Sequence, residues 1–274
     1  MPDDGPHAPT RACGPSSCPP YAGAVPEPTP RYRTQPVSFV RRSARLGPRL
    51  QQSWDAHHEQ YVLEAPRDVA RTSVDPSFVV DPEAVFGRRA PFVVEIGSGQ
   101  GDAVVAAAER EPERDFLAVE VYLPGLARTV HRSARAGLTN VRLLQVNAVE
   151  VLASTLPAGS VDELWVFFPD PWHKQRHHKR RLVTDSFARL VERVLRAPGG
   201  NGPDGERGGT LRLATDWAEY AHQMIAVLDA SPGLRNVHGA GGVAPRFEGR
   251  VLTGFERKGE VAGRTITDLE YVRR

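Results

Sequence analysis

Three acidic residues in the middle of the chain stand where short apolar segments end. Glu95 precedes the turn Gly97-Ser98-Gly99-Gln100-Gly101, Glu120 ends a second apolar segment, and Asp170 lies between two prolines after a third. Glycines let a backbone approach a ligand closely, and carboxylates accept hydrogen bonds from ammonium and hydroxyl groups. The pattern predicts a pocket for a small ligand that carries such groups.

The spacing of the glycines narrows the ligand. A dinucleotide site typically reads G-x-G-x-x-G and holds a pyrophosphate at a helix N-terminus, whereas Gly97, Gly99 and Gly101 read G-x-G-x-G. Glu95 would repel a pyrophosphate but would attract the ammonium of an amino-acid-like ligand. S-adenosylmethionine has that ammonium and no phosphate, so the pattern favours it over NAD. Glu120 is then placed to hold both ribose hydroxyls, the alternative being a solvated strand end.

Asp170 is the leading candidate for a residue at the reaction centre. It follows the apolar segment Leu164–Phe168, and ligands bind at the carboxyl ends of strands in open α/β sheets. Its carboxylate can accept from an ammonium or from the N1–H and 2-amino edge of guanine, or stabilise a positive charge on a product; an ordinary Asp-Pro turn is the alternative. Asn147 follows the third apolar segment, and we expect it to lie near an adenine and to cap the next helix.

The segment after Asp170 is strongly basic. The eight residues from His173 to Arg180 include four Lys or Arg and three His. Such clusters are typical of a surface that meets phosphates, with Arg and Lys on phosphate and His and Trp172 on bases; a solvated basic surface is the alternative. His173 and His177 have the spacing of a zinc pair, but no nearby Cys or acid completes a site, so no metal is expected.

Alternating strands and helices must position these residues. Apolar segments rich in β-formers predict strands over Phe92–Ile96, Phe116–Val121, Val141–Val146, Leu164–Phe168 and Thr210–Thr215. Helices are predicted over Asp102–Arg110, along the stripe Leu123, Leu126, Ala127, Val130 and Ala134, over Phe187–Leu195, and from Asp216 through Leu228. Asn147 with Glu150, and Asp216 with Glu219, have the form of capping boxes. The order predicts an α/β, Rossmann-like fold with a mostly parallel central sheet and helices on both faces.

The two ends of the chain depart from this alternation. Residues 1–30 are predicted to be a disordered Pro-rich tail, residues 31–70 an Arg-rich arm with a short helix starting at Gln51, and residues 71–274 one domain. Towards the C-terminus, Leu234–His238 and Thr265–Val272 are predicted strands around a turn-rich segment, Arg250–Gly259. Gly199–Gly209 is predicted to be an inserted loop.

Composition limits the class of protein. Hydrophobic content of 40% and charged content of 25% are ordinary for a globular domain, and the formal net charge is only +2. The positive charge is nevertheless segregated, with six Arg and no acid in residues 31–50. The two cysteines, Cys13 and Cys18, match no zinc spacing and form no disulfide scaffold. No apolar run reaches the roughly 18 residues of a membrane span, and no signal peptide is recognisable, so we expect a cytoplasmic protein.

The motifs together resemble those of a known family. Five segments occur in the family's order: Glu95-Ile96-Gly97-Ser98-Gly99, Phe168-Pro169-Asp170-Pro171-Trp172-His173-Lys174, Arg176-His177-His178-Lys179-Arg180-Arg181-Leu182, Ala214-Thr215-Asp216-Trp217 and Thr253-Gly254-Phe255-Glu256. From about Ser38 to the C-terminus, the chain resembles the bacterial tRNA (guanine-N7-)-methyltransferases. The resemblance implies a Rossmann-like methyltransferase fold and S-adenosyl-L-methionine-dependent methylation of N7 of a variable-loop guanosine (position 46) in tRNA.

Carried over position by position, the resemblance also implies roles for individual residues. The cofactor positions are Glu95, Gly97, Gly99, Glu120, Asn147 and Asp170, and Asp170 is also the family's proposed catalytic residue. The substrate positions are Lys174, Asp216, Thr253, Gly254, Phe255 and Glu256. The RNA-contacting loop comprises Arg176, His177, His178, Lys179, Arg180 and Arg181, and Ser38–Arg42 with Arg45 resemble the N-terminal arm. The chain departs from the family at Asn147, where Asp is usual, and at Val251, where Pro is usual.

The implied reaction is a direct methyl transfer. Guanine N7 has a lone pair and no proton, so the enzyme must align the reactants and stabilise a cationic product, with Asp170, Asp216 and Glu256 as candidates. Three alternatives stay open: another RNA or DNA methyltransferase of this fold, an NAD-dependent oxidoreductase, and a non-catalytic RNA-binding module. An amino-methyltransferase would have Asn/Asp-Pro-Pro-aromatic after the fourth strand, which this chain lacks. We expect tRNA as the partner of a monomer or homodimer, with no membrane and no protein partner.

Overall fold

The computed structural model describes residues 45–68, 72–199 and 207–274. The predicted tail, the arm residues Ser38–Arg42 and the middle of the Gly199–Gly209 loop lie outside the described residues, and these expectations stay predictions. In the part of the chain that is described, no helix has the length and apolar content that crossing a membrane requires.

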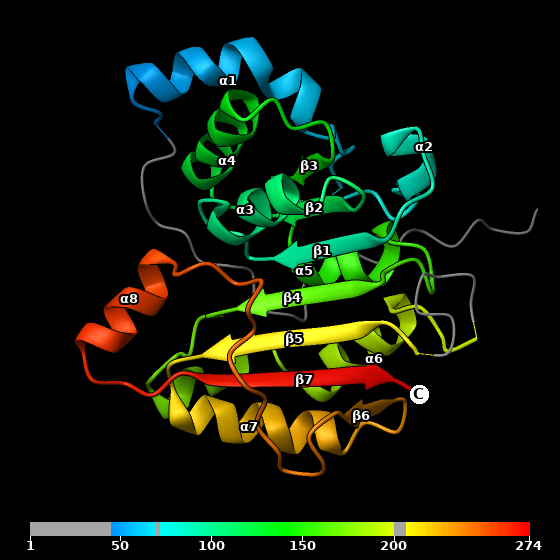
Figure 1. The fold of residues 1–274 in the computed structure, drawn as a ribbon, viewed down its shortest axis with the longest axis vertical. Coiled ribbons are helices and arrows are strands. Elements are labelled where there is room, and N and C mark those ends of the chain that lie inside the picture. Colours follow the sequence, from blue (N-terminus) through cyan, green and yellow to red (C-terminus); the bar gives the residue numbers. More distant parts are fainter. Residues whose placement is uncertain (1–44, 69–71, 200–206) are drawn as a thin grey trace, which may run out of the picture. The chain divides into compact units, whose positions relative to one another are not determined.

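A seven-stranded sheet forms the centre of the fold (Figure 1). Its strands lie in the order β3 (Val141–Leu144), β2 (Asp115–Val119), β1 (Phe92–Ile96), β4 (Glu163–Phe167), β5 (Thr210–Thr215), β7 (Thr267–Arg273) and β6 (Leu234–Asn236). Strands β1 to β5 are parallel, and β7 lies antiparallel between β5 and β6. The predicted α/β fold with a mostly parallel sheet is confirmed, and β1 and β5 have their predicted bounds.

Helices cover both faces of this sheet. They are α1 (Pro48–Tyr61), α2 (Pro82–Phe86), α3 (Asp102–Arg110), α4 (Leu123–Arg135), α5 (Ala148–Glu150), α6 (Asp185–Val194), α7 (Ala218–Asp229) and α8 (Gly254–Val261), with a π-helical turn η1 (Val151–Thr155) and a 3-10 helix η2 (Gln175–Arg180).

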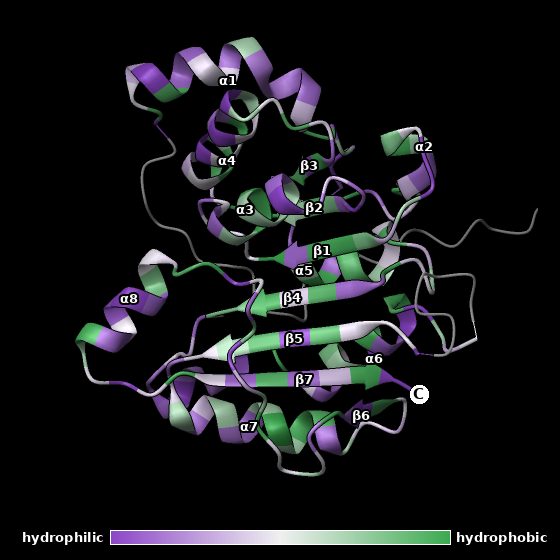
Figure 2. Cartoon of the chain, viewed as in Figure 1, coloured by the Kyte–Doolittle hydropathy of each residue, from purple (hydrophilic) through white to green (hydrophobic). Residues whose placement is uncertain are grey.

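Because side chains alternate along a strand, each face has its own core. Val93 and Trp165 pack with side chains of α1, α3 and α4, whereas Val94 and Val166 pack with those of η1, α6 and α7. Figure 2 shows the resulting pattern, with predominantly apolar central strands and polar residues along the outer side of α1.

Three parallel strands end one or two residues earlier than predicted. Strand β2 ends at Val119, β3 at Leu144 and β4 at Phe167. After β4, Phe168 takes a left-handed backbone φ of 51°, which takes the chain out of the sheet. Because β2 and β4 end early, Glu120 and the segment around Asp170 lie in the loops at the carboxyl edge of the sheet.

Neither predicted capping box forms as expected. Asn147 does cap α5, since its side chain accepts from Val149 N–H, but Glu150 accepts from Val74 N–H and the Asn147 N–H donates to Thr72. Helix α7 begins only at Ala218 with Trp217 at its N-cap, so Asp216 is not a cap. Distant partners take these carboxylates instead, as Asp216 pairs with Arg264 and Glu219 with Arg181.

Two helices differ from the sequence expectation. Helix α1 begins at Pro48 rather than at Gln51, extends to Tyr61 and buries that tyrosine in the core. Helix α8 (Gly254–Val261) begins inside the segment Arg250–Gly259, which was predicted to be turn-rich, and Thr253 caps it by accepting from Glu256 N–H. The prediction was wrong because α8 has no apolar stripe; a buried ion pair at Glu256 stabilises it instead.

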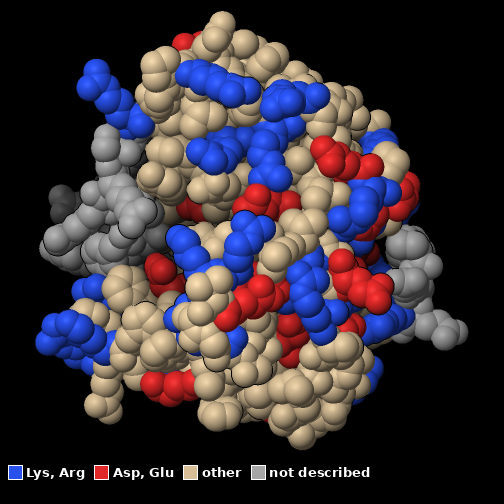
Figure 3. Space-filling view, turned by 60° about the vertical axis from the view of Figure 1, so that its left-hand side comes forward, with Lys and Arg blue, Asp and Glu red and all other residues tan. Residues whose placement is uncertain are grey.

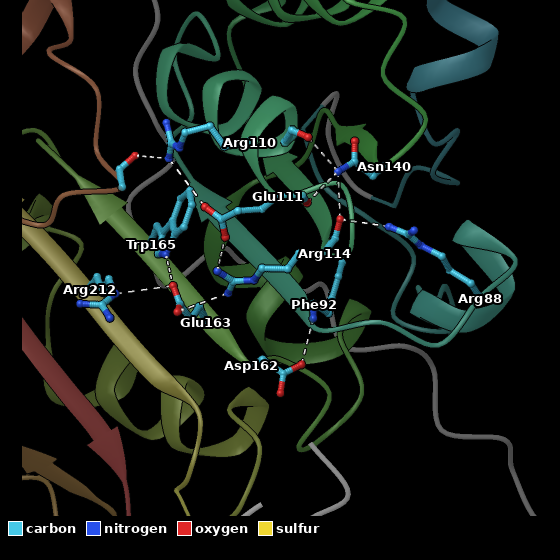
Figure 4. A network of polar contacts seen from close by, with 12 residues as sticks. Arg88, Phe92, Arg110, Glu111, Arg114, Asn140, Asp162, Glu163, Trp165 and Arg212 are labelled. Carbon is cyan, nitrogen blue, oxygen red and sulfur yellow. Dashed lines mark hydrogen bonds and ion pairs between the residues drawn. The ribbon is translucent and has the colours of Figure 1, made fainter. Parts of the chain in front are cut away.

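A polar network joins the amino ends of the strands (Figure 4). Asp162 accepts from the N–H of Phe92, and Glu163 accepts from Trp165 Nε1 at 2.8 Å and pairs with Arg114 and Arg212. Asn140 donates to the carbonyl groups of Ala108, Glu111 and Arg114, which ties the β2–β3 side to α3. Because these polar groups bind one another at the amino ends of the strands, we expect the ligand site at the carboxyl ends of the strands.

Candidate active site at the carboxyl ends of the strands

The strand order has its switch point between β1 and β4, and the space outside the carboxyl ends of these two strands is called the crevice below. Chain connections from β1 lead outward through β2 to β3, whereas β4 returns to the other side of β1. Ligands bind at such a switch point, outside the carboxyl ends of the strands. The loop after β1 is the glycine turn and the loop after β4 carries Asp170, so the two strongest sequence signals meet there.

The glycine turn needs glycine for its backbone shape and for close packing. Gly97, Gly99 and Gly101 have positive φ angles of 73°, 58° and 72°, a region that other residues rarely adopt. Helix α4 also approaches the turn closely, because a Cβ atom at Gly125 would lie 2.2 Å from the carbonyl oxygen of Gly99. The turn is therefore held in one conformation by the start of α4.

Glu120 braces this turn from the end of β2. Its Oε2 accepts from the N–H of Gly99 at 2.9 Å, and its Oε1 accepts from the N–H groups of Val121 and Tyr122 at 2.7 and 2.8 Å. Burial raises the pKa of Glu120, these hydrogen bonds oppose the rise, and the charge of Asp170 adds to it. Glu120 and Asp170 thus share one electrostatic environment at the crevice.

Glu95 is a buried acid with an unmet hydrogen-bonding group. Its side chain lies in β1 with only 4% of the residue exposed, and Oε2 has no hydrogen-bond partner among the described residues. Burial raises its pKa to about 8, against a hydrogen bond from the backbone of Val104. The Oγ atom of Ser98, in the adjoining turn, is also buried without a described partner. Two orphaned polar atoms beside open space at Gly97 fit a ligand with a cationic or donor group.

Asn147 has a structural role at the third strand. It is 8% exposed, and its side-chain oxygen accepts from Val149 N–H at 3.0 Å. The oxygen is therefore already used as a helix cap, which leaves its amide group as a donor for an adenine nitrogen acceptor.

Asp170 lies in a backbone segment of unusual conformation, and its carboxylate is available to bind a ligand. Phe168 donates its N–H to the carbonyl of Ala214, and both Phe168 and Trp172 have positive φ angles, 51° and 47°. In the described part of the chain, the Asp170 carboxylate has no hydrogen bond or ion pair, and the residue is exposed. Partial desolvation raises its pKa and the charge of His173 opposes the rise. A constrained carboxylate without a partner suits the recognition of a bound cation or base edge.

The basic loop is ordered by ring contacts. Trp172 lies edge-on to His177 with ring centres 5.8 Å apart, and the guanidinium of Arg180 lies 4.9 Å from the Trp172 ring centre. The pKa of His177 is lowered, first by burial and then by the charges of Arg180 and three neighbouring cations. Lys174, Arg176 and Lys179 extend into solvent.

Arg181 differs from the rest of this loop. It is only 2% exposed, and it donates to the carbonyl of Pro171 at 2.8 Å and to the Gln223 side chain at 2.7 Å. Its guanidinium also lies 4.9 Å from the ring centre of Tyr220. Arg181 anchors the loop to α7, and its role as an RNA contact stays a prediction.

The C-terminal substrate candidates divide into exposed and buried groups. Phe255 is 62% exposed on α8, next to Gly254, whereas Glu256 is 1% exposed. Glu256 pairs with Arg246 at 2.9 Å and with Arg250 at 3.3 Å. Thr253 uses its hydroxyl oxygen as the cap of α8. Glu256 is thus taken up by internal ion pairs, and its expected role at a substrate base is not supported by this geometry.

One aromatic residue near the site was missed by sequence reasoning. The rings of Trp217 and His173 lie with centres 4.1 Å apart, and Trp217 Nε1 is buried without a described hydrogen-bond partner. Trp217 directly follows the candidate Asp216, and an aromatic residue in that position was the available signal. The contact joins the loops after β4 and β5.

Comparison with known proteins shows the family of the chain. Residues 89–269 match a family model described as "Putative methyltransferase", which spans the sheet from β1 into β7. The chain is 47% identical to the tRNA (guanine-N(7)-)-methyltransferase of Paenarthrobacter aurescens (strain TC1), covering 89% of this chain and 93% of that protein. It is 48% identical to a protein of the same name from a Nocardioides species, covering 89% and 90%.

Proposed function

The chain belongs to the family of bacterial tRNA (guanine-N7-)-methyltransferases, and we propose how its residues carry out that activity. The protein is an enzyme that uses S-adenosylmethionine to methylate guanine N7 in tRNA. We extend this to a variable-loop guanosine, as the motifs imply, and to the cytoplasm, where tRNA is found. All the side chains that we assign below to the cofactor and to tRNA belong to one copy of the chain.

The cofactor would be held at the carboxyl ends of β1 to β3. The observation that carries this is the orphaned Oε2 of Glu95, buried beside the glycine turn. An ammonium group in this position would satisfy that oxygen and favour the charged carboxylate. Glu120 would accept from ribose hydroxyls through lone pairs not used by its backbone donors, and the Asn147 amide would face the adenine.

Asp170 would stabilise the positive charge that passes from the sulfur of the cofactor to the guanine base during the reaction. Bound S-adenosylmethionine supplies a methyl group on positively charged sulfur, and guanine N7 accepts it through its own lone pair. No base is required, so the protein contributes alignment and stabilisation of the cationic 7-methylguanine. Asp170 is the carboxylate best suited to this because it is exposed, constrained and unpaired in the described chain. Asp216 is less suited because Arg264 already neutralises it.

Substrate binding would rely on the basic loop and on exposed aromatic groups. Lys174, Arg176 and Lys179 can contact phosphates, and Phe255 can stack on a base. A guanine that is stacked in folded tRNA must be drawn out, which costs a few kcal/mol. Phosphate contacts around the crevice would offset that cost.

One experiment tests the activity directly. The purified protein is incubated with methyl-labelled S-adenosylmethionine and unmodified tRNA, and the RNA is digested to nucleosides. We expect label in 7-methylguanosine only, and far less of it with Asp170→Asn. Label in another nucleoside would identify a different RNA methyltransferase of this fold. Tight tRNA binding without any transfer would favour the non-catalytic RNA-binding alternative.

A further inference from the structure

We propose that a second cationic surface, on α1 and α4, binds the phosphate backbone of the tRNA away from the modified base. We define this α1–α4 surface by Arg49 and His57 of α1 and Arg128, His131 and Arg135 of α4. The inference rests on the proposed tRNA substrate and adds a contact region that the basic loop and the N-terminal arm do not include.

The outer side of α4 carries only positive or neutral groups. The helix buries Leu126, Ala127 and Val130 against the sheet and contains no Asp or Glu. Its solvent side therefore presents Arg128, Arg132 and Arg135. Like charges at i and i+4 on a helix repel, as Arg128 and Arg132 do here. A helix surface without acids is less stable by itself, and an anionic partner would offset that repulsion.

The charges of α1 and α4 converge on one place. His131 Nδ1 lies 3.1 Å from Ser53 Oγ, which joins the two helices. The pKa of His131 is lowered by burial and then by the charges of Arg49, Arg135, Arg128 and His57. These groups are thus close enough to act on the same imidazole. Figure 3 shows Lys and Arg side chains gathered over the upper part of the molecule, at the level of α1 and α4 in Figure 1.

Most of these arginines have no acidic partner in the described chain. Arg49, Arg128 and Arg135 form no ion pair there, whereas Arg132 pairs with Asp102. Acids do occur nearby: Asp55 and Glu59 lie on α1, and Glu109 lines a shallow hollow with Arg132 and Arg135. None of these acids forms an ion pair with the three arginines in the described chain, so these guanidinium groups are not engaged and can contact an anionic partner.

The surface is continuous with the active site. Arg132, the middle arginine on α4, donates to the carbonyl oxygen of Gln100 in the glycine turn, so the row of cations on α4 adjoins the rim of the crevice. Arg128, Arg132 and Arg135 are spaced about 6 and about 4.5 Å along the helix axis. Such a row can follow a phosphate backbone that leaves the site.

The position of the surface indicates the size of its partner. Helix α4 connects β2 to β3 on one side of the crevice, whereas the basic loop follows β4 on the other side. A folded RNA with phosphates on either side of its target base can contact both regions, and tRNA is such a molecule.

Charge removal with a matched control tests the proposal. The surface variant combines Arg49→Ala, Arg128→Ala and Arg135→Ala. The control combines Arg89→Ala, Arg189→Ala and Arg235→Ala, which removes the same charge from exposed positions elsewhere. Thermal unfolding and the cofactor dissociation constant of both variants are measured first, and the corresponding single variants replace any triple variant that unfolds.

The salt dependence of tRNA binding then gives the answer. We expect the slope of log K against log salt to become shallower by about 0.9 for each phosphate that the variant no longer neutralises, up to about 2.7. At 0.1 M salt, three fewer neutralised phosphates correspond to an affinity on the order of 10²-fold weaker. The control variant should keep the wild-type slope, and kcat at saturating tRNA should be unchanged.

The outcomes separate this inference from the proposed function. A surface variant with the slope of the control would overturn the inference and leave a solvated face, or a face for an acidic protein, as the explanation. If the wild-type protein makes no 7-methylguanosine, and the surface variant still binds tRNA with a shallower salt slope than wild type, the proposed function alone is overturned.

Discussion

Arg250 and Glu256 form a fully buried ion pair, with Nη2 of the arginine 3.3 Å from Oε1 of the glutamate. The same Nη2 lies 2.9 Å from Asp268 of β7, and the guanidinium lies 5.6 and 5.2 Å from the ring centres of Phe167 and Phe168. Arg250 therefore ties the start of α8 to the strand that leads into Asp170. It is a positioning residue for both parts of the site.

Replacing Arg250 should destabilise the protein strongly. Arg250→Met would leave Asp268 without its cation in a buried setting, and breaking such a pair costs about 3–5 kcal/mol. Arg246→Met is the matched control, because Arg246 is partly exposed and Glu256 keeps Arg250 as a partner. Denaturant unfolding measures both variants. If both variants lower the free energy of unfolding equally, the buried ion pair contributes no more to stability than the partly exposed one.

Glu95 should make stability fall as pH rises. Its folded-state pKa is about 8, raised by burial from an ordinary value of 4.5, so between these pH values the unfolded chain has released a proton that the folded chain keeps. The free energy of unfolding therefore decreases by at most about 1.4 kcal/mol per pH unit in this window.

Glu95→Gln should remove that pH dependence. The stability of the variant relative to wild type is expected to increase steadily from pH 5 to pH 8, and thermal unfolding at several pH values measures it. The exposed Glu113→Gln serves as control and should follow wild type. A constant difference between Glu95→Gln and wild type across this range would contradict the assignment.

A methyl group at Gly125 should disturb the glycine turn. Gly125→Ala would place a Cβ atom 2.2 Å from the Gly99 carbonyl oxygen, and α4 or the turn must move. We expect a stability decrease on the order of 1–3 kcal/mol and weaker cofactor binding by calorimetry. Gly47→Ala, which meets no atom within 4 Å, should do neither. Normal cofactor affinity in Gly125→Ala would show that the turn tolerates displacement.

Asp170→Asn should abolish most activity while the fold is kept. The carboxylate has no partner in the described chain, so its replacement should change stability by no more than about 0.5 kcal/mol. Removing a group that stabilises developing charge typically lowers kcat about 10²–10³-fold. Single-turnover methylation and tRNA binding are measured together. Retained turnover with abolished tRNA binding would assign Asp170 to substrate binding instead.

Reversing charge in the basic loop should weaken tRNA binding. Arg176→Glu, Lys179→Glu and Arg180→Glu together should give a shallower salt slope, because each phosphate contact contributes about 0.9 to it. Arg181 is left unchanged in this variant because it anchors the loop through Pro171 and Gln223. If the slope of this variant stays at the wild-type value, the loop does not lie in the interface.

Local patterns predicted the parts of the fold that depend on neighbouring residues. Strand β1, helix α3 and strand β5 have their predicted bounds, since apolar runs and the glycine turn are signals within a few residues. The second capping box failed because Asp216 pairs with Arg264, 48 residues away along the chain. The anchoring of Arg181 was not predicted for the same reason, since its partner Gln223 lies 42 residues away.

The amino-acid sequence by itself determined which chemical groups the protein has and the family to which it belongs. The glycine turn, Glu95, Glu120 and the segment around Asp170 already indicated a methyl donor and a nucleic acid. Only the tertiary structure decided which charged groups are available. Glu256 and Asp170 are both acids in family motifs, yet one is buried between two arginines and the other is exposed and unpaired among the described residues. Burial and long-range partners make that difference, because the free energy of a charge depends on its surroundings rather than on its residue type.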